Sequence, residues 1–324
     1  MNINKTKIYY DNDADLNIIK SKTILVVGYG NQGRAQAKNL ADSGIKVIVG
    51  LRENSKSHYK AKKDGLNSTI ISKGVIDADI ISILIPDQNI NEVFNNDIKP
   101  YLIANQTLLF SHGYNIYYKK IIPPKNINVI MVAPSGAGII VRKSFKKNSG
   151  VANLIAISQD YTGNSFEIAL SYSKAIGGTR AGSFLSTFKE ETESDLFGEQ
   201  AVLCGGIPAL IQAAYEVLVD SGFQPIVAWY VCFYEVKLIV DLFHEKGFNH
   251  MYDSISDTAE FGGLKQGNRI INKEVKNELK NILKEIQNKE FFREFENDAK
   301  NEFIKLKKMR KINFNTLFDK NNNL

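Results

Sequence analysis

The sequence predicts an α/β protein, with a doubly wound parallel sheet in the first half of the chain and an all-helical second half. Up to about residue 180, short runs rich in valine, isoleucine and leucine alternate with helix-like segments, as strands and crossover helices do in such a sheet. After Phe184 strand-like runs are few, and the charged, amphipathic segment Lys273–Lys311 is typical of helices packed on a surface.

The expected strands are marked by six apolar runs that lack clean alternation, because strands buried on both faces of a parallel sheet lose it. A helix is expected between the first two, over Gly33–Asp42. We place a domain boundary at the glycine-containing segment 178–182, which gives a first domain over 1–181, a helical domain over 182–311 and a flexible polar tail over 312–324. The six runs are Thr23–Gly28, Lys46–Gly50, Ile80–Ile85, Thr107–Phe110, Val129–Ala133 and Ala152–Ile157.

The composition excludes several classes of protein. With 44% hydrophobic and 23% charged residues, the 324-residue chain is typical of globular proteins, and two cysteines are too few for a disulfide framework. The N-terminus is polar, and no stretch approaches the ~18 consecutive apolar residues of a membrane span. Acidic residues are interleaved with the basic ones that give the net charge of +6, so a solvated surface explains this charge better than nucleic-acid binding. We therefore expect a cytoplasmic protein without a membrane or nucleic-acid partner.

The segment Gly28–Gly33 (GYGNQG) has glycines at the three positions of the dinucleotide-binding pattern G-x-G-x-x-G. It follows an expected strand and opens an expected helix, which is the context that the pattern requires. Gly28 allows the tight turn, Gly30 lets a pyrophosphate approach the backbone, and Gly33 lets the helix pack on the strand. The helix N-terminus adds N–H groups and partial positive charge for the phosphates. The first domain is therefore predicted to be a Rossmann domain.

The end of the second expected strand decides between NADP and NAD. A carboxylate at this position would accept a hydrogen bond from the ribose 2′-hydroxyl of NAD. The strand leads instead into Arg52, followed by Ser55 and Ser57, which suit a 2′-phosphate. We therefore predict NADP(H). NAD remains the alternative, because the adjacent Glu53 could take the hydroxyl-binding role.

Acidic residues gather at the start of the helical half. Glu191, Asp195 and Glu199 stand at i, i+4 and i+8, so they share one face of a helix. Like charges at this spacing repel each other, and a divalent cation such as Mg²⁺ would offset the repulsion. A solvated acidic face is the alternative. Glu235 lies in the apolar run 229–240, so we expect it to be buried and either paired or metal-bound.

Two further polar residues are candidates for contacts with a substrate. His112 follows the fourth expected strand, at the edge where open α/β sheets bind ligands, and can relay a proton. A histidine in an ordinary turn is the alternative. Ser256 or Asp257 is expected to cap a helix, which does not exclude a contact between the Ser256 hydroxyl and a substrate.

Six motifs resemble, in order and over nearly the whole chain, the short-chain (class I) ketol-acid reductoisomerases, also called acetohydroxy-acid isomeroreductases. The resemblance implies a Rossmann domain, a knotted all-helical C-terminal domain, and a homo-oligomer, at least a dimer, with active sites built across the interface. It also implies conversion of 2-acetolactate-type substrates to 2,3-dihydroxy acids, a step of valine and isoleucine biosynthesis, with NADPH and one or two Mg²⁺ ions. The motifs are GYGNQG, GLRENSKS, SHGYNI, FKEETESDLFGEQAVLCGG, EVKLIVDL and SISDTAEFG.

The resemblance also implies roles for individual residues. Asp195, Glu199 and Glu235, the last of these from a partner subunit, would hold the metal. His112, Glu191 and Glu199 would be catalytic, and Ser256 would hold the substrate carboxylate. The cofactor would be bound by Gly28, Tyr29, Gly30, Gln32, Gly33, Arg52, Ser55, Ser57, Asp87, Gln88 and Gly138.

The sequence departs from the family pattern at several positions of the active site. Where the family motif is V-A-P-K-G-P-G-H, this chain has VAPSGAGI, with Ser135 in place of a catalytic lysine and Ile139 in place of a histidine. On a later helix Val231 and Tyr234 replace a glutamate and a histidine. Two alternatives to the family activity follow. One is a diverged NADP-dependent reductase of another 2-keto acid, ketol or imine with an impaired isomerase step, and the other is a non-catalytic NADP-binding paralogue.

Overall fold

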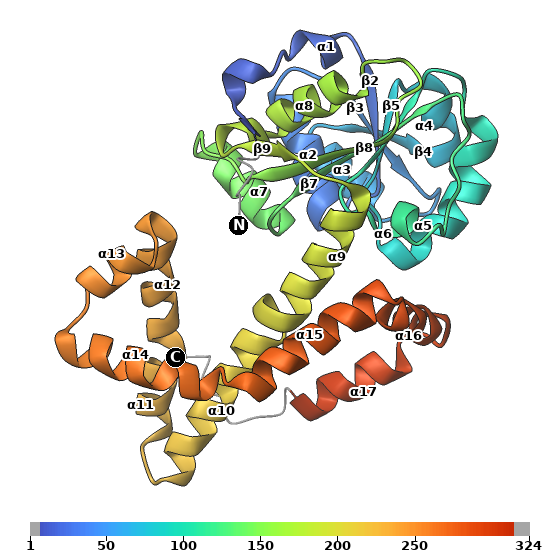
Figure 1. Cartoon of the computed structure of the whole chain (residues 1–324). Helices are drawn as coiled ribbons and strands as arrows, with labels where there is room; N and C mark the ends of the chain where they lie inside the picture. Colours follow the sequence, from blue (N-terminus) through green and yellow to red (C-terminus); the bar gives the residue numbers. More distant parts are fainter. Residues whose placement is uncertain (1–6, 314–324) are drawn as a thin grey trace. The chain divides into compact units, whose positions relative to one another are not determined.

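The computed structural model describes residues 7–313. The chain divides into two compact units, Met1–Thr192 and Glu193–Leu324 (Figure 1). Of the tail expected from residue 312, only the first two residues are described, and they end the helix α17 (Ile304–Asn313). The rest of that tail lies outside the described residues.

A nine-stranded sheet forms the centre of the first unit (Figure 1). All six predicted strands are present, as β2, β3, β5, β6, β7 and β8. The strands lie in the order β1-β9-β8-β7-β6-β5-β2-β3-β4, and the prediction of a doubly wound α/β fold is confirmed. Their bounds are β1 (Ile8–Tyr9), β2 (Thr23–Val27), β3 (Lys46–Leu51), β4 (Asn67–Ile70), β5 (Ile80–Ile83), β6 (Thr107–Phe110), β7 (Asn128–Pro134), β8 (Asn153–Gln159) and β9 (Ser183–Leu185).

Two pairs of strands depart from the purely parallel arrangement that the sequence predicted. β8 runs antiparallel to β7, with Asn153 opposite Pro134, and β1 runs antiparallel to β9. β8 turns back because the segment between β7 and β8, which contains α7 (Gly138–Lys146), begins and ends at the same edge of the sheet. The other neighbouring pairs are parallel.

Two apolar cores, one on each face, attach the helices to the sheet. Successive strand residues point to opposite faces, so Val26 lies in one core while Leu25 and Val27 lie in the other. The first core includes residues of α1, α2, α3 and α8, and the second includes residues of α4 and α5. The helices of this unit are α1 (Asn17–Lys20), α2 (Asn31–Asp42), α3 (Ser57–Lys63), α4 (Ile71–Asp77), α5 (Asp87–Val93), α6 (Tyr114–Tyr117), α7 and α8 (Ser165–Ile176).

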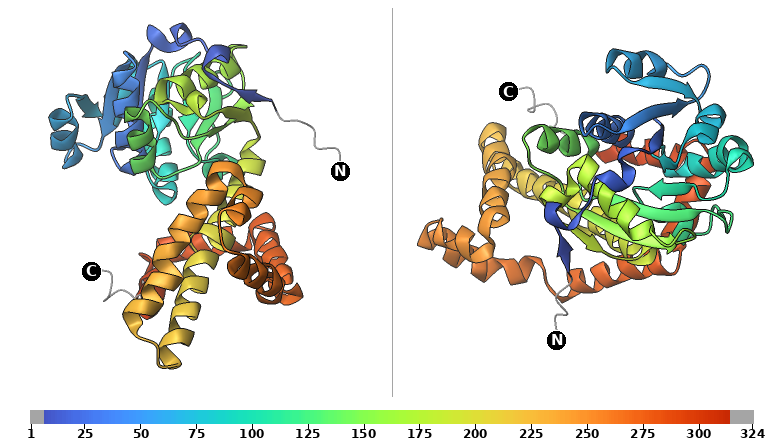
Figure 2. Two further views of the ribbon diagram at one scale, coloured as in Figure 1. Left: turned by 90° about the vertical axis from the view of Figure 1, so that its left-hand side faces the viewer. Right: turned by 90° about the horizontal axis from the view of Figure 1, so that it is seen from above.

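The described residues of the second unit form helices joined by short connections, with no strand among them, as predicted. α15 packs against α16, and α16 packs against α17 (Figure 2). α10 packs against α11 and against the π-helical segment Tyr230–Tyr234. The remaining helices are α9 (Phe188–Gly198), which begins in the first unit, α10 (Gly206–Asp220), α11 (Pro225–Trp229), α12 (Glu235–Lys246), α13 (Phe248–Asp253), α14 (Asp257–Ile270), α15 (Lys273–Gln287) and α16 (Glu290–Lys300).

One helical stretch is long and apolar enough to cross a membrane by length and composition alone. It covers Phe188–Asp220 and joins α9 to α10. The sequence has no unbroken apolar run of that length there, because residues such as Gln200 and Gly205 interrupt it. A single helix of this kind is weak evidence, and acidic residues crowd its first turns.

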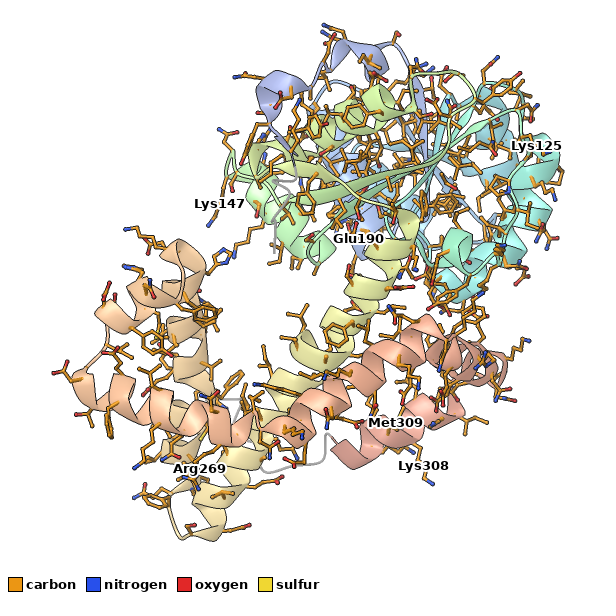
Figure 3. The ribbon with its side chains drawn as sticks, in the orientation of Figure 1. Lys125, Lys147, Glu190, Arg269, Lys308 and Met309 are labelled. Carbon is orange, nitrogen blue, oxygen red and sulfur yellow. The ribbon has the colours of Figure 1, made fainter. Side chains whose placement is uncertain are left out.

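Many large apolar side chains of the second unit are exposed in the single chain. Met309 of α17, labelled in Figure 3, is 44% exposed. Large apolar patches on a protein surface mark contact sites for other molecules. Exposed apolar residues between α10 and α12 include Ile207, Leu210, Val217, Val227, Tyr230, Val231, Tyr234, Leu238 and Ile239.

Candidate functional site

The glycine turn joins β2 to α2 in the geometry that the motif requires. Gly28 has a φ of +97°, and a Cβ added there would lie 2.6 Å from Cγ2 of Ile85. A Cβ on Gly33 would lie 2.3 Å from the Gly28 carbonyl oxygen, so the helix packs on the turn only because residue 33 has no side chain. Gly30 is the N-cap of α2, and no atom lies within 4 Å of its Cβ position. The turn is therefore closed towards the protein and open at Gly30, where a phosphate can approach the N–H groups.

A pocket opens beside this turn, at the edge where β2, β5 and β6 end. It brings together residues from three separate segments to which roles were assigned from the sequence, namely Gly30 and Gln32, Asp87, and His112. Carboxyl ends of parallel strands are where open α/β sheets bind their ligands. The pocket is lined by Gly30, Asn31, Gln32, Ile83, Leu84, Ile85, Pro86, Asp87, Ile90, Phe110, Ser111 and His112.

The loop that follows β7 packs against the glycine turn. Nε2 of Gln32 donates a hydrogen bond to the Gly136 carbonyl oxygen at 2.8 Å. A Cβ on Gly138 would lie 2.2 Å from the carbonyl oxygen of Asn31, so the structure gives Gly138 a packing role at this contact. Gly138 also lines a second pocket that adjoins Gly30. Ser135, in the same loop, is exposed.

His112 forms a pair with Glu191 at the start of α9. Nδ1 of His112 lies 2.9 Å from Oε1 of Glu191, and the Gly113 N–H donates to Oε2 at 2.7 Å. The Glu191 side chain is 4% exposed and the His112 side chain 20%. Because a carboxylate only accepts hydrogen bonds, Nδ1 carries a hydrogen, and Nε2 is the nitrogen that can exchange a proton with a ligand. The pair therefore presents an oriented imidazole at the pocket.

Asp87 opens α5 and lines the same pocket. Nδ2 of Asn115 donates to its Oδ1 at 3.0 Å. Burial raises the pKa of the Asp87 carboxyl above its usual value, and the nearby His112 is the largest influence in the opposite direction. Asn115 lies in the motif SHGYNI, but nothing in the sequence assigned it a role of its own. Gln88, the next residue of α5, is half-buried and lines neither of the two pockets described above.

The loop after β3 carries the residues assigned to the 2′-phosphate. Arg52 and Glu53 are exposed, while Ser55 and Ser57 are half-buried. The Ser57 N–H donates to Oγ of Ser55 at 3.2 Å, and the Arg52 carbonyl oxygen accepts from the Ser55 N–H at 3.0 Å. The serines thus shape the loop that enters α3, and the exposed arginine stands at its start.

The three acidic residues predicted to share a helix face lie on two consecutive helical segments. Glu191 and Asp195 stand one turn apart on α9, with carboxylate oxygens within 4.8 Å of one another. The regular helix ends at Gly198, and Glu199 opens the π-helical segment Glu199–Leu203, where the Cys204 N–H donates to the Glu199 carbonyl oxygen at 2.7 Å. Asp195 and Glu199 are exposed. Two carboxylate oxygens this close suit a hard divalent cation such as Mg²⁺.

The prediction that Glu235 is buried is wrong for the single chain. Glu235 opens α12 and is exposed, as are Leu238 and Ile239 on the same helix. Other residues of the apolar run, such as Val236, are half-buried, but the run does not bury the carboxylate. The prediction of a cap at Ser256 is confirmed, because its Oγ accepts from the Ala259 N–H at 3.3 Å at the start of α14.

The sequence analysis also missed a polar network beneath the pocket. Nε2 of Gln36 donates to Oγ of Ser111 at 3.0 Å, and the Tyr172 hydroxyl donates to Oε1 of Gln36 at 2.9 Å. Tyr29, which the resemblance assigned to the cofactor, is 6% exposed, and its hydroxyl donates to Asp64 at 2.9 Å. The Tyr29 side chain is therefore buried in the protein and hydrogen-bonded to it. Nothing in the spacing of these residues signals the contacts, since they join segments far apart in the chain.

Comparisons with known proteins agree on one family. Residues 18–182 match the model of the acetohydroxy acid isomeroreductase NADPH-binding domain, and residues 188–323 match that of the ketol-acid reductoisomerase C-terminal domain. The chain is 49% identical over 306 residues to "Ketol-acid reductoisomerase (NADP(+))" of Methanococcus maripaludis, covering 94% of this chain and 93% of that protein.

Solved structures give the same result. The structure of an NADH-preferring ketol-acid reductoisomerase from an uncultured archean superposes with a TM-score of 0.94 at 42% identity, covering 97% of this chain and 96% of that one. A semialdehyde dehydrogenase NAD-binding protein from Cupriavidus necator, at 15% identity and a TM-score of 0.64 over 83% of this chain and 99% of that one, shares only the fold. The resemblance found in the sequence is confirmed, and the chain belongs to the ketol-acid reductoisomerase family of oxidoreductases.

Proposed function

We propose that this chain is a cytoplasmic, NADPH-dependent ketol-acid reductoisomerase that converts 2-acetolactate-type substrates to 2,3-dihydroxy acids in valine and isoleucine biosynthesis. The main support is the pocket in which the open glycine turn, Asp87 and His112 meet, with Glu191 orienting the imidazole. Such a pocket would bring a dinucleotide and a proton-exchanging group together at one edge of the sheet. The relative from Methanococcus maripaludis carries the same activity in its name.

One of the proposed residues would exchange a proton, one would orient that residue, and the others would bind the metal and the substrate. His112 would hold or release a proton at Nε2, while Glu191 fixes its ring. Asp195, Glu199 and Glu235 would hold one or two Mg²⁺ ions, and Ser256 would bind the substrate carboxylate. When bound, NADPH would supply the hydride and the metal would polarise the substrate oxygens as a Lewis acid.

NADPH is proposed over NADH because of the exposed Arg52 beside Ser55 and Ser57. The structural relative with a TM-score of 0.94 is an NADH-preferring enzyme, so family membership alone does not fix the choice. The ratio of the KM values for NADPH and NADH measures it directly, and a lower KM for NADH would favour the hydroxyl-binding role of Glu53.

The activity is tested with purified protein, Mg²⁺, NADPH and 2-acetolactate, by following the oxidation of NADPH. Oxidation that stops when Mg²⁺ is chelated is the expected result. If the protein instead reduces only 3-hydroxy-3-methyl-2-oxobutyrate, the reduction half alone is present. If it binds NADPH tightly but turns over neither substrate, it is a non-catalytic paralogue.

A diverged NADP-dependent reductase of another 2-keto acid, ketol or imine is the second candidate. The observation that favours it is Ser135, which stands in the place of the family lysine, in the loop held to the glycine turn by the contact between Gln32 and Gly136. With serine in place of lysine, the site lacks a cation and the proton donor that a lysine would provide. Val231, in place of a family glutamate, removes a carboxylate.

Restoring both groups separates the two candidates. Ser135→Lys combined with Val231→Glu is expected to raise turnover of 2-acetolactate about tenfold if these losses redirected the site, since a positioned acid or base contributes at least that much. The initial rate of NADPH oxidation at saturating substrate measures it. The two single variants are the controls, and an unchanged or lower rate in the double variant would contradict the idea that these two positions limit the reaction.

We further propose that the protein is a homo-oligomer, at least a dimer, formed through the second unit. The exposed apolar residues between α10 and α12 support this, because so large an apolar surface is costly to leave in water. Light scattering of the purified protein gives the mass in solution. A monomer at micromolar concentration would contradict the proposal.

A further inference from the structure

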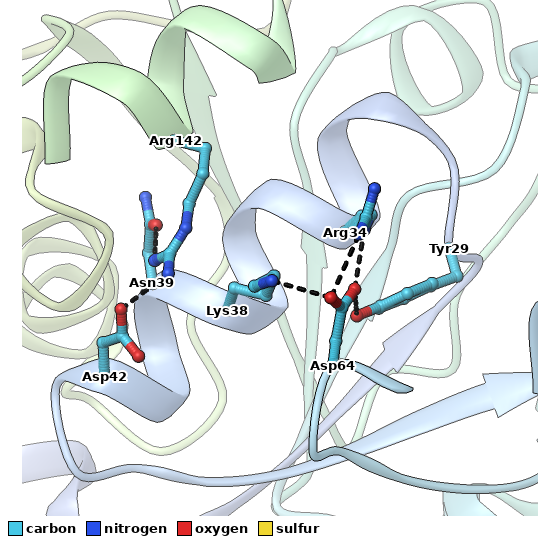
Figure 4. Close-up of polar contacts among 7 residues, drawn as sticks. All are labelled: Tyr29, Arg34, Lys38, Asn39, Asp42, Asp64 and Arg142. Carbon is cyan, nitrogen blue, oxygen red and sulfur yellow. Dashed lines mark hydrogen bonds and ion pairs between the residues drawn. The ribbon is translucent and has the colours of Figure 1, made fainter. Parts of the chain in front are cut away.

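Asp64 gathers three side chains around one carboxylate (Figure 4). It is the C-cap of α3, and its side chain is 9% exposed. The Tyr29 hydroxyl donates to Oδ2 at 2.9 Å, and Arg34 donates through Nε to Oδ2 at 2.6 Å and through Nη2 to Oδ1 at 3.0 Å. Nζ of Lys38 donates to Oδ1 at 2.8 Å. Four donors therefore fill the acceptor sites of one carboxylate.

The charges of this cluster settle which group holds each proton. Hydrogen bonds from Arg34 are the main reason that the pKa of Asp64 lies well below its usual range. Burial, followed by the contact with Asp64, raises the pKa of Tyr29 above its usual value. Near neutral pH the carboxylate is ionised and the phenol is neutral, so the hydroxyl of Tyr29 is the donor.

Tyr29 connects the cluster to the cofactor turn, because it stands between the first two glycines of the motif. Its side chain is buried, and its far end is fixed by Asp64. On the other side the turn is held by close contacts at Gly28 and Gly33, where added Cβ atoms would lie 2.6 Å and 2.3 Å from protein atoms. The backbone of the turn is thus restrained both by the Tyr29 side chain and by the close packing at Gly28 and Gly33.

We propose that Asp64 is a positioning residue for the dinucleotide: by fixing Tyr29, it holds the N–H groups of the glycine turn in the orientation that a pyrophosphate requires. The inference rests on the proposed use of a dinucleotide cofactor. Asp64 lies in the connection between α3 and β4, outside the glycine motif. A residue of this connection thus contributes to the affinity for the cofactor.

The negative charge of Asp64 should weaken the binding of an anionic cofactor, whereas its hydrogen bond to Tyr29 should strengthen that binding. Arg34 and Lys38 line the second pocket together with Gly30, and the Asp64 carboxylate reduces the positive charge that they present to phosphates. If charge alone mattered, removing the carboxylate would tighten the binding of an anionic cofactor. If positioning dominates, removing it weakens binding, so the sign of the change decides between the two.

The experiment compares Asp64→Asn with the wild-type full-length protein by titration with NADPH, followed by the fluorescence of the nicotinamide. The Kd of NADPH is expected to rise about tenfold, as the loss of an anchoring charged hydrogen bond allows. The KM for NADPH should rise in parallel while kcat at saturating NADPH stays unchanged. Tyr29→Phe should raise the Kd about threefold, and the double variant should bind no more weakly than Asp64→Asn, because both changes break one connection.

Asp42→Asn is the matched control. Asp42 is the last residue of α2, its carboxylate also pairs with an arginine, at 2.7 Å from Nη2 of Arg142, and it lies at the end of the helix remote from the turn (Figure 4). Its Kd for NADPH should not rise, because the loss of the Asp42 charge leaves Arg142, which also lines the second pocket, no less positive.

Several outcomes would overturn the inference. They are an unchanged or lower Kd in Asp64→Asn, an equal rise in Asp42→Asn, and additive effects in the double variant. If Asp64→Asn does not fold, Tyr29→Phe alone decides, since it removes a single buried oxygen atom. Wild-type protein that binds no dinucleotide overturns the proposed function as well, whereas wild-type binding with an unaffected Asp64→Asn variant overturns only this inference.

Discussion

Replacement of Glu191 by glutamine is expected to lower kcat about a hundredfold, as the loss of an oriented acid or base does, while the Kd of NADPH stays within about twofold of the wild type. The carboxylate accepts from the Gly113 N–H at 2.7 Å and from the ring of His112 at 2.9 Å. A glutamine has one acceptor oxygen and one NH₂ group, so one of these donors would face another donor. The imidazole would then lose its fixed tautomer.

Steady-state rates at saturating NADPH and substrate measure this effect, and titration with NADPH measures binding separately. Glu190→Gln is the control, because Glu190 is the neighbouring exposed carboxylate at the start of α9, labelled in Figure 3, and accepts from Oγ of Ser186 at 2.7 Å. It should retain the wild-type kcat. A kcat of Glu191→Gln within twofold of the wild type would show that the pair with His112 has no part in the reaction.

The elements that could be predicted from the sequence are those in which neighbouring residues carry the signal. The run Thr23–Val27, the glycines after it and the helix that follows form a continuous local pattern, and the structure has the strand, the turn and the helix there. β9 could not be predicted in this way. It has three residues, Ser183–Leu185, and it exists as a strand because it pairs with β8 and with Ile8–Tyr9, which is remote in the sequence.

The same distinction applies to the site. Sequence reasoning singled out His112 and Glu191, but it did not pair them, because 79 residues separate them and only the meeting of the loop after β6 with α9 brings them together. The contacts of Asp87 with Asn115 and of Tyr29 with Asp64 are of the same kind. For Glu235 the sequence was misleading. Its apolar neighbours in the sequence predicted burial, but Glu235 lies on an exposed face of α12 and is not buried within the single chain.

Two alanine substitutions in the glycine turn are expected to have different consequences, although they lie three residues apart. Gly30→Ala should weaken NADPH binding at least about tenfold and leave the thermal midpoint of unfolding unchanged. The backbone at residue 30 has a φ of −81°, which alanine adopts readily, and no atom lies within 4 Å of its Cβ position. The added methyl group therefore meets no protein atom, and it stands where a pyrophosphate must approach the backbone.

Gly33→Ala should lower both the affinity and the stability. Its Cβ would lie 2.3 Å from the carbonyl oxygen of Gly28 and 3.0 Å from the carbonyl carbon, so the backbone itself must move, at a cost of about 1–3 kcal/mol. Titration with NADPH and thermal unfolding without cofactor measure the two effects separately. If Gly30→Ala binds NADPH like the wild type, the phosphates do not lie against this turn, because only a ligand placed there can sense a methyl group that the protein tolerates.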